Sequence, residues 1–313
     1  ALTPDASVRE YFRVPWQGCT AIAAVYPEPF DSDAQSFLDI TKLFAEANLP
    51  IPQILDVDGA NGIILQEDLG DRQLRTVLES SSEDESEKHV NYAISLIADI
   101  QAATSLAYKQ DSIASRLAFD EAKLGWELNF FLEHYFGSLR KEELKASEKA
   151  ELQNECQTIA AELAARPRVL CHRDFHTSNL MVDGVGQLRI VDYQDARMGP
   201  TSYDLVTLLL DRRLEPPSSA ELHEKKLLFF EERWQRGLPI IDAEEFASEF
   251  RLMTVQRCLK AVGTFSCQTG VYGRGAVYAQ FIDPALLIVL QAAEWLDRFP
   301  TLCAAIRARL NDR

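Results

Sequence analysis

Paired cysteines, long apolar runs and basic side chains are all scarce in this chain of 313 residues. Its six cysteines form no Cys-x-x-Cys pair, which predicts reduced thiols in a cytoplasmic protein, each buried in a structural role. No signal peptide is recognisable, and the longest apolar run, 285–290, is too short to cross a bilayer, so we expect no membrane partner. The formal net charge of −16 disfavours nucleic acid, because phosphate backbones are bound by basic patches.

The distribution of short apolar runs predicts two lobes. We expect strands at 8–14, 20–26, 53–57 and 62–65, with one helix at 35–47. Helical periodicity dominates afterwards, and the expected helices are 89–106, 119–136, 145–165, 202–213, 219–235, 243–265 and 284–309. Segment 66–70 would connect the lobes, and the acidic segment 80–87 would be a loop. The predicted fold class is α+β, with an N-terminal lobe at 1–69 and a C-terminal lobe at 70–313 around a cleft.

One segment, 171–195, carries the strongest chemical signal and reads CHRDFHTSNLMVDGVGQLRIVDYQD. Two apolar runs flank turn chemistry at 183–187, which predicts a β-hairpin. If Val182 lies opposite Arg189, then Asn179 lies opposite Asp192. The hairpin would place an amide oxygen beside a carboxylate, and two such hard oxygen ligands suit Mg²⁺ carried on a nucleotide phosphate.

Asp174 precedes the hairpin on the entering loop and could accept a proton from a substrate hydroxyl. Any single Asp or Asn could be a turn or capping residue, but the spacing of Asp174, Asn179 and Asp192 favours catalysis. A binuclear metallohydrolase is the weaker alternative for the cluster formed by His172, Asp174 and His176. The chain has only three other histidines, too few for a second group of metal ligands.

Segment 172–179, HRDFHTSN, resembles the HxDxxxxN catalytic loop of the aminoglycoside phosphotransferase and choline kinase superfamily. The segments 190–192, IVD, and 199–205, GPTSYDL, resemble the parts that follow it in that family. The resemblance implies a bilobal, protein-kinase-like fold, with Asp174 as the catalytic base and with Asn179 and Asp192 as Mg²⁺ ligands. It also implies that Asp204 braces the catalytic loop, whereas His172 is expected to shape that loop through backbone hydrogen bonds.

Kinases of this fold usually hold the nucleotide phosphates with a strand lysine paired to a helix glutamate. The corresponding strand here, 20–26, has no lysine, and the following helix offers only Asp39 and Glu46. The small polar segment 5–7, including Ser7, suits a turn whose backbone N–H groups bind phosphate. Arg9 and Arg13 are the only cations nearby; either could replace the lysine, and both could equally be surface residues.

The segments DASVREYFR, LQEDLG and VQRCLKAVGTF, together with the catalytic loop, resemble the bacterial N-acetylmuramate/N-acetylglucosamine 1-kinases. That branch shares the absent strand lysine, and its substrate is an amino sugar phosphorylated at the anomeric hydroxyl. The connector then resembles the adenine-binding hinge, where backbone groups of Glu67 and Leu69 would meet the base.

Several residues are candidates for contacts with the acceptor. Trp126 and Glu127 lie on a helix that could face the cleft, although a tryptophan on such a helix is more often part of the core. Arg257 and Lys260 lie on the helix 243–265, where a solvated polar face is an equally good interpretation. Asp195, just after the metal-binding segment, could contact substrate or lie at the surface.

The sequence therefore predicts an ATP- and Mg²⁺-dependent kinase that acts on a small-molecule hydroxyl, with an N-acetylated amino sugar as the preferred acceptor. An aminoglycoside or another small alcohol is the alternative acceptor. A nucleotide-binding, pseudokinase-like protein is the alternative class, supported by the missing lysine and opposed by the intact Asp, Asn and Asp set.

Overall fold

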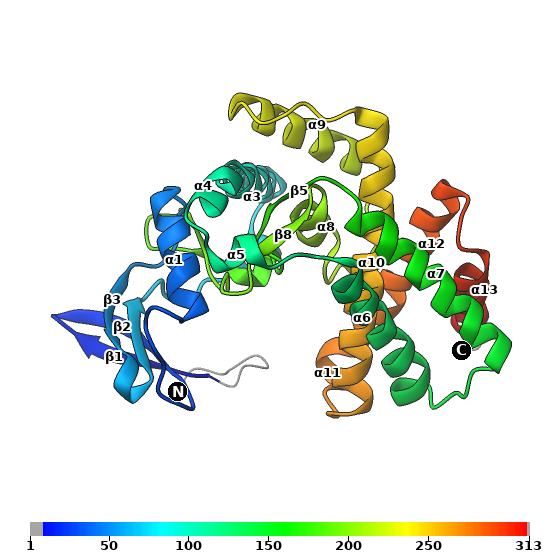
Figure 1. Ribbon diagram of the computed structural model, residues 1–313, viewed down its shortest axis with the longest axis horizontal. Helices are drawn as coiled ribbons and strands as arrows, with labels where there is room; N and C mark the ends of the chain where they lie inside the picture. Colours follow the sequence, from blue (N-terminus) through cyan, green and yellow to red (C-terminus); the bar gives the residue numbers. More distant parts are fainter. Residues whose placement is uncertain (1–8, 312–313) are drawn as a thin grey trace.

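The structure is a computed structural model that describes residues 9–311, with a small β-sheet at one end and helices through most of the remainder (Figure 1). The strands of this sheet lie in the order β1-β2-β4-β3, and each neighbouring pair is antiparallel. Their bounds are β1 Glu10–Trp16, β2 Cys19–Val25, β3 Ile54–Asp58 and β4 Ile63–Glu67. The sheet contains the four strands expected from the sequence, each displaced by one or two residues at its ends.

The first hairpin shows why the sequence folds this way locally. Gln17 and Gly18 form the turn between β1 and β2, and both have positive φ, +44° and +84°. Tight hairpin turns require this backbone conformation, which glycine adopts without a steric penalty. Pro15 is tolerated within β1 because β1 is an edge strand, where a missing N–H disrupts no ladder on the outer side.

Helix α1 (Ser36–Glu46) joins the sheet to the helical part of the molecule. The rings of Phe37 and Phe44 each lie 5.2 Å from that of Tyr193, and Thr41 Oγ1 is 3.0 Å from the Tyr193 hydroxyl. Asp39 accepts a hydrogen bond of 2.8 Å from the backbone N–H of Ile113. The two lobes consequently share one continuous hydrophobic core.

The hairpin of β6 (Leu180–Val182) and β7 (Leu188–Ile190) also spans the lobes. The N–H of Val182 donates to the carbonyl of Arg72, and that of Ile190 donates to the carbonyl of Pro50, both at 2.8 Å. The Arg189 guanidinium lies 2.6 Å from the carboxylate of Glu67 at the end of β4. The segment that carries the catalytic motif is thus attached directly to the sheet.

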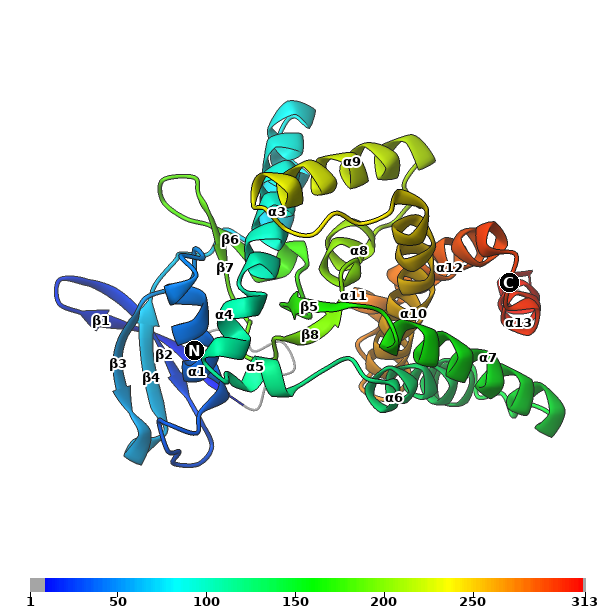
Figure 2. The same ribbon diagram turned by 45° about the horizontal axis from the view of Figure 1, so that its top comes forward.

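The helical lobe contains two further strands, β5 (Arg168–Cys171) and β8 (Arg197–Pro200), which pair with each other. Its helices pack around these strands, with α6 and α10 on the side away from the sheet (Figure 2). A π-helical segment, Leu132–Leu139, continues α6. The helices are α2 Leu74–Ser80, α3 Glu83–Ala102, α4 Thr104–Lys109, α5 Ile113–Arg116, α6 Glu121–Phe131, α7 Ala146–Ala164, α8 Tyr203–Leu210, α9 Ser219–Gln235, α10 Ala243–Gly270, α11 Gly275–Tyr278, α12 Ile282–Leu296 and α13 Pro300–Asn311.

Helix α10 runs through the centre of this lobe and packs on α6 at very short range. A Cβ atom on Gly263 would lie 2.9 Å from the backbone of Phe131, closer than real contacts allow. Glycine at this position therefore lets the backbones of α10 and α6 approach each other closely.

Two expectations about helix bounds are wrong. Segment 80–87 is not a loop, because Ser82 and Glu85 form a capping box that begins α3 at Glu83. Segment 284–309 is not one helix, because the chain leaves α12 at Asp297, with a φ of +52°, and restarts at Pro300. Proline is favoured at the first helical position, where its missing N–H costs nothing.

The structure also bears on the cysteine and membrane expectations. Five of the six free cysteines are buried as expected, whereas Cys19, in the turn-proximal end of β2, is exposed. One stretch, Gly275–Leu296, is long and apolar enough to cross a membrane, and 56% of its most apolar window is buried inside the protein. That burial is what a core helix packed against α10 would show.

Candidate active site

The hairpin register differs by one residue from the expected one. Leu180 lies opposite Ile190 and Val182 opposite Leu188, so the expected pairing of Val182 with Arg189 is wrong. The five-residue turn causes the shift: the Asp183 carboxylate accepts hydrogen bonds from two backbone N–H groups within it and fixes its length. The residue opposite Asn179 is Val191, whose N–H donates to the Asn179 carbonyl at 3.1 Å.

Asn179 and Asp192 nevertheless lie together. Asp192 has a φ of +64°, and this left-handed turn directs its carboxylate back toward the hairpin. The amide Nδ2 of Asn179 lies 3.3 Å from Asp192 Oδ2 and donates to the carbonyl of Asp174 at 3.0 Å. A backbone turn, rather than direct cross-strand pairing, therefore brings the two candidate metal ligands into contact.

The buried carboxylate of Asp204 fixes the catalytic loop through hydrogen bonds to its backbone. Asp204, in the first turn of α8, accepts hydrogen bonds from the backbone N–H groups of His172 at 2.7 Å and Arg173 at 3.1 Å. Burial raises the pKa of Asp204 to about 7. His172 is fully buried, and its Nε2 lies 3.0 Å from the Val191 carbonyl, which links the loop to the hairpin. Burial also lowers the pKa of His172 to about 4.

Asp174, the candidate base, lies at the tip of this loop among cations. Arg257 Nη2 donates to Asp174 Oδ1 at 2.9 Å, and Lys260 Nζ lies 3.4 Å from the same oxygen. Burial alone would raise the pKa of Asp174, but Lys260, Arg257 and Arg173 outweigh it and hold the pKa well below its usual range. The carboxylate is therefore ionised at neutral pH and able to accept a hydrogen bond from an alcohol.

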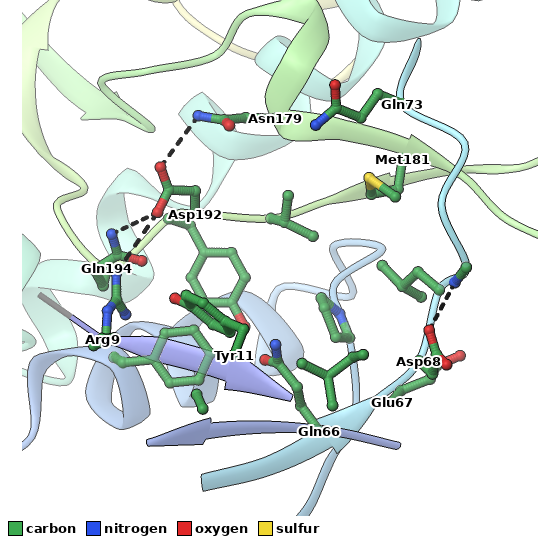
Figure 3. Close-up of a pocket in the computed structure, with 18 residues that line it drawn as sticks. Arg9, Tyr11, Gln66, Glu67, Asp68, Gln73, Asn179, Met181, Asp192 and Gln194 are labelled. Carbon is green, nitrogen blue, oxygen red and sulfur yellow. Dashed lines mark hydrogen bonds and ion pairs between the residues drawn. The ribbon is translucent and has the colours of Figure 1, made fainter. Parts of the chain in front are cut away.

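A cavity of about 300 Å³ lies between the sheet and the hairpin (Figure 3). Its apolar wall comes from both lobes and includes Ile22, Ala24, Phe37, Leu69, Met181 and Val191. Polar groups occupy its two ends: Asn179, Asp192, Gln194 and Arg9 at one, and the connector 66–70 at the other. A flat apolar slot with a polar end next to metal ligands suits a nucleotide base and its phosphates.

The two candidate arginines have different surroundings. Arg9 lies at the polar end of the cavity, with Nη2 3.8 Å from Asp192 Oδ1 and its guanidinium 5.7 Å from the rings of Tyr11 and Tyr26. Arg13 does not line the cavity; its guanidinium binds Asp68 at 2.7 Å and Asp71 at 2.8 Å. Arg9 alone of the two is directed at the metal end. Ser7 lies outside the described residues.

Ile22 and Ala24 of β2 face the cavity where a strand lysine would reach the phosphates, and no lysine lines it among residues 9–311. The acidic residues of α1 have other partners: Asp39 bonds to Ser112 and the Ile113 N–H, and Glu46 accepts from Gln110. Arg9, entering from the start of β1, is consequently the cation nearest to the candidate metal ligands on this side.

At the other end of the cavity lies the connector. The N–H of Glu67 donates to the carbonyl of Gln53 at 2.8 Å, so the Glu67 carbonyl is the group that could meet a base. Leu69 is buried and lines the cavity. Asp68 accepts hydrogen bonds from Arg13, from Thr20 and from the Gly70 N–H, which fixes the shape of the connector.

The donor set at the polar end fits Mg²⁺. Because Asn179 Nδ2 donates to the Asp174 carbonyl, its Oδ1 is the atom left for a metal, and the Asp192 carboxylate is 47% exposed toward the same space. Gln194 Nε2 donates to Asp192 Oδ1 at 2.8 Å and holds it in place. The part of the chain that the structure describes contains no cluster of three or more His, Cys, Asp or Glu side chains that could hold a metal.

On the far side of Asp174, α6 and α10 bring the acceptor candidates together. Glu127 is buried and accepts from Gln256 Nε2 at 2.9 Å. Arg257 and Lys260 face Asp174, so the interpretation of a solvated polar face is wrong for both. Trp126 is 57% exposed and is not a core residue.

Asp195 binds Arg173 at 2.7 Å, beside the catalytic loop. Three further cations on this side of Asp174, Lys123, Arg173 and Arg197, were not predicted from the sequence. For Lys123, its i, i+4 spacing from Glu127 is a local pattern that could have indicated an interaction.

A two-lobed α+β fold whose catalytic-loop aspartate adjoins an Asn and Asp pair defines a phosphotransferase. Residues 1–239 match the family described as "APH: Phosphotransferase enzyme family", and the chain belongs to that family. It is 30% identical over 264 residues to a protein of Neisseria meningitidis serogroup B named "N-acetylmuramate/N-acetylglucosamine kinase", covering 84% of this chain and 76% of the relative. A Pseudomonas aeruginosa protein of the same name is 31% identical over 265 residues, covering 84% and 74%.

Solved structures agree on the fold. The "microcompartment-associated aminopropanol kinase" superposes with a TM-score of 0.61 at 17% sequence identity, covering 94% of this chain and 91% of that one. At that identity the likeness concerns the fold alone. It supports the protein-kinase-like architecture expected from the sequence.

Proposed function

We propose that the protein is an ATP- and Mg²⁺-dependent kinase that phosphorylates the anomeric hydroxyl of an N-acetylated amino sugar. The observation that carries this proposal is that Asn179 contacts both the Asp174 carbonyl and the Asp192 carboxylate, while Asn179 and Asp192 line the polar end of a cavity of about 300 Å³. A base, two metal ligands and a nucleotide slot together are what phosphoryl transfer to an alcohol requires.

In this proposal the N-terminal lobe, 1–69, and the connector hold the nucleotide. The Glu67 carbonyl and the Leu69 N–H contact the base, while Arg9 and Ser7 contact the phosphates. Asn179 and Asp192 would hold Mg²⁺, which when bound neutralises charge on the β- and γ-phosphates. Because Arg9 replaces the strand lysine in this proposal, the cation comes from the residue just before β1 rather than from β2.

The C-terminal lobe, 70–313, holds and activates the acceptor. Asp174 accepts a hydrogen bond from the sugar hydroxyl, orients its oxygen for in-line attack and takes its proton as the phosphoryl group is transferred. Arg257 keeps Asp174 in place, since its Nε also donates to Thr207 Oγ1 at 2.9 Å. Lys260 stands beside the base where negative charge develops on the transferring group.

An amino sugar fits the charge of the acceptor cleft better than a cationic aminoglycoside. Five cations gather there beside the carboxylates of Glu127, Asp174 and Asp195, and Asp204 and Asp211 also act on one of them, Arg257; the cations are Lys123, Arg173, Arg197, Arg257 and Lys260. The names of the two bacterial relatives favour the same acceptor. Since the six cysteines are unpaired and ATP is the donor, we also propose a cytoplasmic location.

The test is an ATP-consumption assay over N-acetylmuramate, N-acetylglucosamine, an aminoglycoside, choline and homoserine, with and without Mg²⁺. We expect Mg²⁺-dependent turnover on the amino sugars and formation of a phosphate that is labile in acid, as anomeric phosphates are. Turnover on choline or the aminoglycoside alone would refute the acceptor. No turnover on any of them, with nucleotide still bound, would favour a pseudokinase-like binding protein.

A further inference from the structure

We infer that Arg197 and Lys123, together with Arg173, form a subsite for a carboxylate carried by the acceptor. This inference rests on the proposed function and adds a property that the function alone does not require. An amino sugar without an acidic substituent could be phosphorylated with Asp174 and the metal ligands alone.

The pairing of β5 with β8 brings Arg197 to the catalytic loop. Cys171, the last residue of β5, lies opposite Arg197, the first of β8. The chain that enters the loop and the chain that leaves the metal-binding segment therefore run side by side. Arg197 Nη2 lies 3.5 Å from Asp195 Oδ1, and Arg173 Nη1 lies 2.7 Å from Asp195 Oδ2, so a single carboxylate serves two guanidinium groups.

Lys123 faces these arginines from the first turn of α6. Its Nζ lies 3.7 Å from Glu127 Oε1, beyond hydrogen-bonding distance, and 4.3 Å from the centre of the Trp126 ring. The other oxygen of Glu127 accepts from Gln256 at 2.9 Å, and Oε1 has no hydrogen-bond partner among residues 9–311, so Glu127 attracts Lys123 without a hydrogen bond. Trp126, which is exposed, would form one wall for the body of a sugar, since carbohydrates stack on aromatic rings.

Cations are concentrated at this cluster although the chain has a net charge of −16. Lys123, Arg173 and Arg197 share the carboxylates of Glu127 and Asp195, and Arg173 also lies 3.6 Å from Asp174, which Arg257 and Lys260 contact too. Burial and then repulsion from Arg173 lower the pKa of Arg197. Burial also lowers the pKa of Lys123, although Glu127 opposes the change. An anionic group in the cleft would relieve this repulsion.

Buried polar atoms around the same space also have no hydrogen-bond partner among residues 9–311. The donors are Nε of Arg173, Nη1 of Arg257 and the hydroxyl of Tyr203, and the acceptors are Oε1 of Glu127 and Oε1 of Gln256. Arg173 Nε lies 3.6 Å from Asp174 Oδ2, beyond hydrogen-bonding distance. Buried polar groups are normally satisfied, so unsatisfied donors and acceptors around one space support a polar ligand there.

The position of the subsite distinguishes an acceptor carboxylate from a nucleotide phosphate. Arg197 and Lys123 do not line the nucleotide cavity, and the catalytic loop separates them from it. Arg257 and Lys260 contact Asp174 directly, whereas Arg197 is connected to the catalytic loop through Asp195 and Arg173. A carboxylate bound there would belong to a ring substituent other than the reacting hydroxyl, as in N-acetylmuramate.

The test compares three acceptors: N-acetylmuramate, its carboxamide, and N-acetylglucosamine. The variants are Arg197→Gln and Lys123→Met, with Arg116→Gln as a matched control, because Arg116 pairs only with Asp111 on the surface. We expect each cleft variant to lower kcat/KM for N-acetylmuramate relative to N-acetylglucosamine by about tenfold or more, mostly through KM. The wild-type preference for the acid over its carboxamide should shrink by a similar factor, and Arg116→Gln should change neither ratio.

The outcomes separate this inference from the function on which it rests. If wild type turns over both amino sugars and the cleft variants leave the ratio within about twofold, the carboxylate subsite is refuted and the kinase stands. If both substrates are lost equally in soluble, folded variants, Arg197 and Lys123 are structural and the subsite is again refuted. If wild type phosphorylates neither amino sugar, the proposed function fails and this inference with it.

Discussion

The two sides of Asp174 differ in the charges of the side chains that surround them. In the cavity between the lobes, the described lining residues include one cation, Arg9, and three carboxylates, those of Glu67, Asp68 and Asp192. On the other side of Asp174, the cations Lys123, Arg173, Arg197, Arg257 and Lys260 gather around the carboxylates of Glu127, Asp174 and Asp195. Positive charge is thus concentrated on the side where we propose that the acceptor binds, and the proposed nucleotide phosphates would be left to Mg²⁺ and Arg9.

The sides also differ in construction. The nucleotide cavity lies between the lobes, and contacts such as Arg189 with Glu67 determine its width. The acceptor cleft belongs to the helical lobe alone, where the close approach of α10 to α6 at Gly263 determines its geometry. Substitutions on the two sides should therefore act on different kinetic constants, which makes the comparison testable.

The largest effect is expected from Asp174→Asn, which removes the carboxylate proposed as the catalytic base. Loss of the base should lower kcat by about 100- to 10,000-fold. Nucleotide affinity, measured by isothermal titration calorimetry with Mg-ATP, should stay within about threefold, because Asp174 does not line the cavity. The matched control is Asp111→Asn, at the exposed carboxylate that binds Arg116. Retention of wild-type turnover by Asp174→Asn would reject the assigned base.

A smaller effect, on nucleotide binding alone, is expected from Arg9→Met. Removing the cation beside Asp192 should raise KM for ATP about tenfold or more while leaving KM for the sugar nearly unchanged. Arg13→Met is the matched control on the same strand, because Arg13 binds Asp68 and Asp71 instead of lining the cavity. It should raise KM for ATP less than about threefold. Equal increases in KM for ATP in the two variants would mean that Arg9 does not bind the phosphates directly.

A third effect concerns stability rather than turnover, at His172, the residue that joins the catalytic loop to the hairpin. His172 is neutral in the folded protein, with a pKa of about 4, but gains a proton on unfolding below its ordinary pKa of about 6.5. The unfolded state binds more protons between these values, so the free energy of unfolding falls as the pH is lowered. Between pH 7 and pH 5 the loss is roughly 2 kcal/mol.

His172→Gln keeps a donor for the Val191 carbonyl and cannot titrate. Urea unfolding in EDTA should therefore show a flatter dependence of unfolding free energy on pH for this variant than for wild type. A slope identical to that of wild type between pH 7 and pH 5 would assign the acid sensitivity to other groups, such as His176, whose pKa burial also lowers.

Local sequence patterns predicted the elements that depend on residues close together in the chain. The hairpin, the strand pairs and the motif residues of the catalytic loop followed from periodicity, turn residues and spacing. The register was wrong by one residue, because the carboxylate of Asp183 fixes a turn length that periodicity does not reveal. The start of α3 was missed because the capping box lies in a segment whose acidic composition is equally typical of a loop.

The acceptor cleft could not be anticipated in the same way. Arg173, Arg197 and Lys123 belong to three different elements, and nothing in their local sequence relates them. Arg257 and Lys260 were candidates, but a polar patch on a helix predicts a solvated face as readily as a buried one. Only the packing of α10 against α6 and α8 decides between these possibilities, since it covers Arg257 and directs it at Asp174.

The sequence by itself indicated the proposed chemistry, because Asp174, Asn179 and Asp192 lie within nineteen consecutive residues. The left-handed turn at Asp192 that brings Asn179 and Asp192 into contact did not follow from their spacing. The sequence also determined that no strand lysine is present. The tertiary structure alone decided that Arg9 rather than Arg13 lies beside Asp192, and that the cations of α6, α10 and β8 gather on one side of the base. The physical reason is sequence separation: local geometry acts over a few residues, whereas charges from distant elements meet only after the core has packed.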